Sequence, residues 1–163
     1  MDTTDALPSD TQHARELTRR LIAREASEGD GADAFSAAVQ AATERSLREL
    51  VRWLGANGSR AVVLRALAQV RIDHPALANI RVRPRGELAL EGVAESSESH
   101  GAMAIAQGLE ALLVALFDLL GRLIGSALTA QLVERGAVHP SSNEVPPTRV
   151  PDANESPARR DLE

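Results

Sequence analysis

Arg81, Arg83 and Arg85 occupy alternate positions, and this spacing could build a binding site. In an extended strand, alternate side chains lie on one face, so three guanidinium groups could contact successive phosphates or carboxylates. A solvated hairpin face is the competing interpretation, because exposed strands commonly carry charges that prevent aggregation. The sequence favours the solvated face and keeps the three arginines as candidate anion or nucleic-acid contacts.

A second candidate anion site is segment 55–59, Gly-Ala-Asn-Gly-Ser, which is followed by Arg60. Free backbone amides and the helix dipole attract negative charge at the start of a helix. The segment follows a predicted helix instead of a strand, however, and it lacks the Lys-Ser/Thr pair of a phosphate-binding loop. We therefore interpret it as a helix end followed by a new helix that Ser59 caps.

Arg60 and the three alternating arginines suggest an alternative function as a winged-helix-like DNA-binding protein, in which the hairpin is the wing. The formal net charge of −5 argues against this alternative. Proteins that bind nucleic acids usually present a broad basic field to the phosphates. Nucleic acid is therefore not the expected partner.

No group of residues has the spacing of a catalytic or metal site. The chain has no cysteine, and none of its histidines pairs with another histidine or a carboxylate at ligand spacing: His13, His74, His100 and His139. Ser59 and Ser126 lack the context of a nucleophile elbow. Glu110 and Asp118 lie two turns apart on an expected solvent-exposed seam, too exposed for an acid–base pair. We predict no catalytic residues, no cofactor, no metal and a non-enzymatic protein.

The longest apolar stretch, residues 101–125, should position the other elements. Large apolar residues recur there at steps of three and four, which lines one face of an α-helix: Leu109, Leu112, Leu113, Leu116, Phe117, Leu120, Leu123 and Ile124. A narrow seam is polar: Gln107, Glu110, Asp118 and Arg122. The helix is long enough to cross a bilayer, but its charges interrupt the uncharged run that a span needs. We expect a soluble core helix and no membrane span.

Helical periodicity and capping residues predict further helices over residues 10–26, 33–54, 60–73 and 127–134, the last with Leu128 facing inward. Glu44 and Arg48 are spaced for an ion pair on a solvated helix face. Alternating apolar and charged residues around Pro84 predict a small β-hairpin near residues 80–90, and residues 91–100 suggest an exposed connection.

The predicted fold class is mainly α. It is a bundle of about five helices around the Leu-rich central helix, with one small β-hairpin and disordered termini. Residues 9–135 form a single helical domain, residues 1–8 are a disordered start, and residues 136–163 are a disordered Pro-rich tail.

A helix, a turn ahead of the His74-Pro75 stop, a short hairpin and a Leu-rich helix follow one another along the chain. This order resembles that of small uncharacterised bacterial helical proteins over residues 17–133. The resemblance reaches no characterised family. It implies no activity, and no site residue is carried over from it.

The central helix is expected to be apolar on more sides than three neighbouring helices can cover. This predicts that a second subunit covers the remainder, so we expect a homodimer. The candidate interaction surface is formed by leucines of that helix: Leu112, Leu116, Leu119 and Leu123. Gly121 and Gly125 have the spacing that allows helices to approach closely.

The function that the sequence favours is a non-enzymatic protein-interaction or regulatory module that associates with a partner protein or with itself. An apolar-ligand carrier, or an enzyme with an unrecognised site, is a further alternative. The acidic start of the chain lacks the positive leader and apolar segment of a signal peptide, so we expect a cytoplasmic protein.

Overall fold

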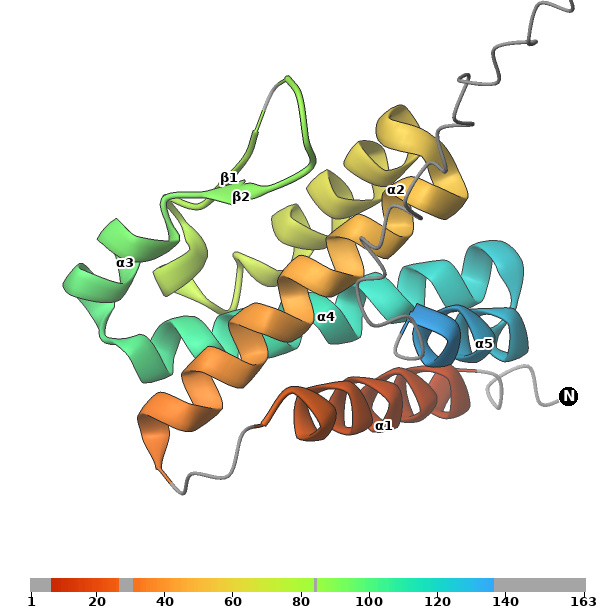
Figure 1. Ribbon diagram of the computed structural model, residues 1–163, viewed down its shortest axis with the longest axis horizontal. Helices are drawn as coiled ribbons and strands as arrows, with labels where there is room; N and C mark the ends of the chain where they lie inside the picture. Colours follow the sequence, from red (N-terminus) through yellow and green to blue (C-terminus); the bar gives the residue numbers. More distant parts are fainter. Residues whose placement is uncertain (1–6, 27–30, 84, 137–163) are drawn as a thin grey trace, which may run out of the picture.

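Most of the described chain is helical. The computed structural model describes residues 7–26, 31–83 and 85–136. Within these ranges the elements are α1 (Leu7–Glu25), α2 (Ala32–Val70), the 3₁₀ helix η1 (Pro75–Leu77), β1 (Arg81–Val82), β2 (Leu90–Glu91), α3 (Val93–His100), α4 (Ala102–Ile124) and α5 (Ser126–Gly136). The two strands pair antiparallel, with Arg81 opposite Glu91 and Val82 opposite Leu90. The predicted mainly α fold with one small hairpin is confirmed (Figure 1).

Helix α4 is the centre of the bundle, as its apolar periodicity predicts. Helices α1, α2, α3 and α5 and the short η1 all contact it. Its fully buried large side chains are Ile105, Leu109, Leu112, Leu113 and Leu116. By length and hydropathy alone this helix could also cross a membrane, but 61% of its most apolar window is buried inside the bundle. The predicted stripe is wrong at its end, because Leu123 is 66% exposed.

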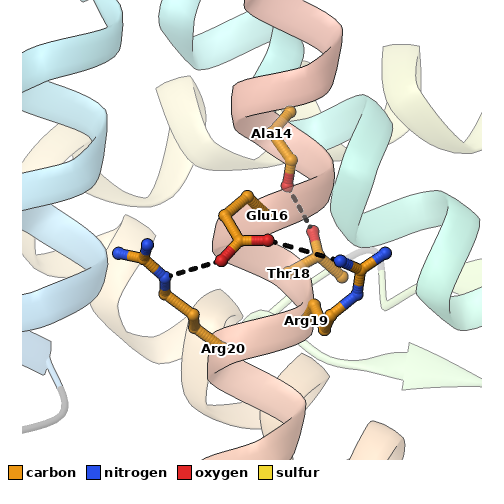
Figure 2. A network of polar contacts seen from close by, with 5 residues as sticks. All are labelled: Ala14, Glu16, Thr18, Arg19 and Arg20. Carbon is orange, nitrogen blue, oxygen red and sulfur yellow. Dashed lines mark hydrogen bonds and ion pairs between the residues drawn. The ribbon is translucent and has the colours of Figure 1, made fainter.

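Helix α1 separates a buried face from a solvent face. Thr18 is fully buried, and its hydroxyl donates to the carbonyl oxygen of Ala14 at 2.9 Å, so no polar group is left unpaired there (Figure 2). On the exposed face, the Glu16 carboxylate accepts from Arg20 Nε at 2.9 Å and lies 3.4 Å from a terminal nitrogen of Arg19. Exposed pairs of this kind add little to stability.

The ends of the domain differ slightly from the prediction. Helix α1 begins at Leu7, so Leu7 and Pro8 are helical instead of belonging to a disordered start. Proline fits the first turn of a helix, because its missing N–H would have no partner there. Helix α5 extends to Gly136. The other residues predicted to be disordered, 1–6 and 137–163, lie outside the described residues.

Helix α2 changes direction at Gly55, as the sequence predicts. Gly55 has φ 70° and ψ 170°, a positive φ that glycine adopts without steric cost. The break takes one residue instead of the five expected. Ser59 is therefore not a cap: it lies inside the second half of the helix, and its hydroxyl donates to the Gly55 carbonyl oxygen at 2.7 Å. Figure 1 shows the second half leading towards the hairpin.

The predicted exposed connection over residues 91–100 is wrong, because most of it is helix α3. Gly92 precedes the helix with φ 87°, and a Cβ at this position would lie 2.8 Å from the carbonyl oxygen of Asn79. Glycine is thus required both for the backbone conformation and for the close approach. Ser96 is buried, and the helix packs on η1 and α4.

The closest approach to a glycine of α4 is at Gly108. A Cβ at Gly108 would lie 2.8 Å from Cγ of Leu77, a fully buried residue of η1. At Gly121 an added Cβ would meet only Ser126 Cα, at 3.9 Å, and at Gly125 it would meet nothing within 4 Å. The close packing predicted at Gly121 and Gly125 is therefore found at Gly108 instead.

Asp118 was expected on the solvent-exposed seam of α4, and this prediction is wrong. Its side chain is 11% exposed and lies 3.0 Å from a terminal nitrogen of Arg122, four residues later on the same helix. The hydroxyl of Thr11 on α1 donates to its other carboxylate oxygen at 3.2 Å. Asp118 therefore joins the start of α1 to the last turns of α4.

The contrast between two glycines of α4 gives a first prediction. Gly108→Ala should lower the free energy of unfolding by about 1–2 kcal/mol, because overpacking against Leu77 outweighs the gain in helix propensity. Gly121→Ala, which has room for a methyl group, should raise it by about 0.5–1 kcal/mol. Urea denaturation followed by circular dichroism measures both. Equal effects of the two substitutions would contradict the close packing of η1 on α4.

The buried carboxylate gives a second prediction. Asp118→Ala should lower the free energy of unfolding by about 1.5–3 kcal/mol, because it removes the hydrogen bond that joins α1 to α4 and the ion pair with Arg122 within α4. Glu110→Ala is the matched control two turns earlier on α4, where no ion pair is formed within the described chain, and its effect should stay within about 0.5 kcal/mol. The same urea titration compares them. If Glu110→Ala lowered the free energy of unfolding as much as Asp118→Ala, the stabilising role of the Asp118 contacts would be contradicted.

Candidate functional site

A cleft of about 770 Å³ lies between the first half of α2, the hairpin and α3, with α4 beneath it. Figure 1 shows the hairpin and α3 on one side of this region and the first half of α2 on the other. The apolar lining residues come from all four elements or the turns beside them: Leu47, Leu88, Leu90, Val93 and Leu109. The volume falls in the range of sites that hold a small molecule or a few side chains.

The hairpin is anchored to the helices, and β1 contacts α2. Ile80, directly before β1, and Leu88, two residues before β2, are both buried. Arg71, near the end of α2, donates from Nε to the carbonyl oxygen of Leu77 at 3.2 Å and also donates to the carbonyl oxygen of Ile80. Arg71 thus fixes the segment that leads into β1.

Helix α2 supplies one wall of the cleft through residues at helical spacing: Gln40, Thr43, Glu44, Leu47 and Arg48. These residues share a face because steps of three and four return to the same side of a helix. They span nine residues, or about 12 Å of helix axis from the first to the last. The opposite wall includes Val93, Ala94, Ser97 and Glu98 of α3.

The rim of the cleft carries three exposed carboxylates and one exposed guanidinium group: Glu44, Glu87, Glu98 and Arg48. None of the four forms an ion pair within the part of the chain that the structure describes. The predicted pair between Glu44 and Arg48 is absent from that part. Their neighbour Arg45 instead lies 2.9 Å from Glu25 of α1. The cleft therefore has charges free to meet a ligand.

The cleft offers groups for noncovalent binding. Its carboxylates are exposed, and its apolar residues offer a surface for hydrophobic contact. Among the described residues there is no group of three or more histidine, cysteine, aspartate or glutamate side chains placed to hold a metal ion. His139 lies outside the described residues.

The predicted anion-binding arginines do not line the cleft. Arg81, Arg83 and Arg85 are exposed on the hairpin, as the alternating pattern predicts for a solvated face. The Nε of Arg83 lies 2.9 Å from the carboxylate of Glu91, which lowers the positive charge available to a phosphate. Arg60 is partly buried in the second half of α2, about 15 Å along the helix from its C-terminal end.

The predicted interaction surface is largely inside the protein. Leu112 and Leu116 are buried in the core, so they cannot form a surface of the folded chain. Leu119 is partly buried, and Leu123 is exposed. Leu128 of α5, expected to face inward, is 53% exposed. Exposed apolar area therefore lies at the junction of α4 and α5.

Trp53 borders a second, smaller cavity of about 40 Å³ between α1, α2, α4 and α5. Its lining is mostly apolar and includes Phe117, Leu132 and Val133. The Trp53 side chain is 49% exposed, close to the half-buried position expected at a helix junction. This cavity holds about one water-sized volume, so it offers far less room for a ligand than the cleft.

The sequence predicted most of the elements that form the cleft, but it did not predict that they form a cleft. The hairpin and the two long helices were expected, whereas the α3 wall was taken for an exposed connection. One available signal was missed: Gly92 and Gly101 bracket an eight-residue segment with Glu95 in its first turn, a pattern of helix boundaries.

The cleft is assigned from its geometry, because comparison with known proteins supplies no relative from which a role could be inferred. No protein-family model matches the chain, and no match was found among curated proteins or among solved structures.

Proposed function

We propose that this protein is a non-enzymatic interaction module that holds a segment of a partner protein in the cleft between α2, α3 and the hairpin. One observation carries the proposal: the cleft combines an apolar floor with an exposed polar rim. Protein-binding surfaces commonly have this anatomy, in which the centre supplies hydrophobic contact and the rim supplies specificity.

The dimensions of the cleft suit a peptide segment. The α2 wall is about 12 Å long, which corresponds to two turns of a bound helix or to a few residues of an extended chain. Leu47 and Leu109 lie at its floor, and both are buried within the chain. The partly buried Leu90 and Val93 beside them offer the apolar surface that a partner's side chains can contact.

The alternatives have less support from the geometry. An apolar-ligand carrier or an enzyme would be favoured by an enclosed pocket with a buried carboxylate, whereas the carboxylates of this cleft are exposed. The DNA-binding alternative stays a prediction, to be tested by salt-dependent retention on DNA. Our proposal treats α4 as the core of a soluble cytoplasmic protein, in keeping with its burial.

Site-specific photo-crosslinking tests the proposal in the native host. A photoreactive amino acid at Ala94, an exposed residue of the cleft, should crosslink to a discrete partner protein. The same amino acid at Ala68, exposed on the second half of α2, is the matched control and should not capture that partner. Mass spectrometry identifies the partner and the segment attached.

A second substitution makes this test independent of labelling efficiency. Ala94→Trp should fill part of the cleft and abolish capture from a photoreactive group placed at Ala102, another exposed residue of the cleft. Ala68→Trp should leave that capture intact. No crosslinked protein, or the same set of proteins from Ala94 and Ala68, would overturn the proposed function.

We also propose that the protein self-associates as a homodimer, through the junction of α4 and α5. Leu123 and Leu128 stand on either side of Gly125, and both are more than half exposed. Exposed leucines so close together favour a protein–protein contact. This surface replaces Leu112 and Leu116, which are buried.

Sedimentation velocity tests the dimer. The wild-type protein should sediment as a dimer at micromolar concentration, and the double variant Leu123→Glu/Leu128→Glu should sediment as a folded monomer. The control is Leu64→Glu/Ile72→Glu, which places the same charges on exposed apolar positions of α2 and of the turn that follows it and should remain dimeric. A monomeric wild-type protein, or loss of the dimer in the control alone, would contradict the α4–α5 contact.

A further inference from the structure

We infer that the segment held in the cleft is basic and amphipathic, with apolar side chains on the floor and lysine or arginine side chains at the rim. This inference rests on the proposed function and names the chemistry of the partner. It begins with the charge of the rim. Three carboxylates and one guanidinium group leave a net charge of −2 around an apolar floor.

The rim glutamates form no ion pair within the described chain, as is also true of Glu95, Glu110 and Glu134 outside the cleft. Four glutamates outside the cleft each lie 2.9–3.4 Å from an arginine nitrogen: Glu16, Glu25, Glu49 and Glu91. Within the described chain, no arginine pairs with Glu44, Glu87 or Glu98. Cations supplied by a ligand would therefore meet carboxylates that do not have to give up an internal partner.

The placement of the charges gives the bound segment an orientation. Glu44 and Arg48 lie one turn apart on the α2 wall, so their charges largely cancel there. Glu87 and Glu98 come from the hairpin and from α3, and they give the opposite wall its negative charge. A bound segment thus turns its basic side chains towards the hairpin and α3.

The same charges select against other ligands. Nucleic acids and anionic lipid surfaces carry dense negative charge, and unpaired carboxylates repel both. A segment with acidic flanks would place like charges opposite each other, which costs affinity and gives specificity for the basic segment. The cleft therefore distinguishes partners by the sign of the charges beside their apolar residues.

Two fluorescein-labelled synthetic peptides test the inference by fluorescence anisotropy. Both carry leucines at helical spacing over about 14 residues, and they differ in having lysine or glutamate at the flanking positions. The lysine peptide should bind the full-length protein at least about tenfold more tightly than the glutamate peptide at low salt. Raising the salt concentration from about 0.05 M to about 0.5 M should weaken its binding several-fold, because exposed charges are screened.

Paired variants place the effect in the cleft. Glu87→Gln/Glu98→Gln should weaken binding of the lysine peptide about fivefold or more. The control Glu95→Gln/Glu134→Gln removes the same charge from exposed glutamates outside the cleft and should change affinity by less than about twofold. Ala94→Trp should abolish binding, and Ala68→Trp should not. Circular dichroism confirms that each variant is folded.

Each other result overturns the inference. Equal binding of the two peptides would show that the cleft does not select by charge. An equal loss of affinity in the control pair would show that the preference comes from the overall charge of the protein. Failure of the lysine peptide to bind also overturns it. A partner captured at Ala94 through a segment that is not basic would overturn the inference while leaving the proposed function standing, whereas no capture would remove both.

Discussion

The structure depends on covering α4, a helix too apolar to face water on most of its sides. Burial of one leucine side chain contributes about 1.5–3 kcal/mol, so several fully buried leucines on one helix dominate the stability of a small domain. The other helices contact α4 at different points along it, α3 and η1 among them. The cleft follows from this arrangement. The cleft is open to solvent, and its floor includes Leu109, a buried residue of the core helix itself.

Most polar groups inside the bundle are satisfied by hydrogen bonds within their own helix or to the turn before it. Buried hydroxyl groups on three helices donate to the carbonyl oxygen four residues earlier: Thr18, Thr43, Ser46 and Thr129. These side chains are small, and each hydroxyl group has a hydrogen-bond partner four residues earlier in the chain. Neighbouring helices can therefore pack closely against them. Ser36 and Ser96 bury an Oγ without a hydrogen-bond partner in the described chain, and nothing in the structure explains them. The charged residues at the rim of the cleft form no ion pair within the described residues and are exposed to solvent.

How much of this could be predicted from the sequence depended on the strength of each local signal. The core helix and the break at Gly55 were predictable, because apolar periodicity and glycine act within a few residues. Helix α3 was not, because its residues are mostly polar and its stability comes from packing on η1 and α4. The exposure of Leu123 was missed for a related reason: periodicity shows which face is apolar, but not where the neighbouring helices end. The cleft is formed by tertiary packing. Most of its elements could be predicted from the sequence, but their arrangement around a cleft could not.

The hairpin carries arginines that are exposed to solvent and a glutamate that lines the cleft. Its outer arginines, Arg81 and Arg83, are exposed and do not line the cleft, whereas Glu87, Leu88 and Leu90 do. Residues 87–90, which lead into β2, line the cleft, whereas the arginines earlier in the hairpin do not, so one short hairpin can present basic groups to solvent and an apolar, acidic surface to a ligand. A basic segment is then repelled by the outer surface of the hairpin and attracted by the cleft behind it. Because repulsion at wrong sites contributes to specificity as much as attraction at the right one, the arginines that first suggested an anion site can help direct a basic partner into the cleft.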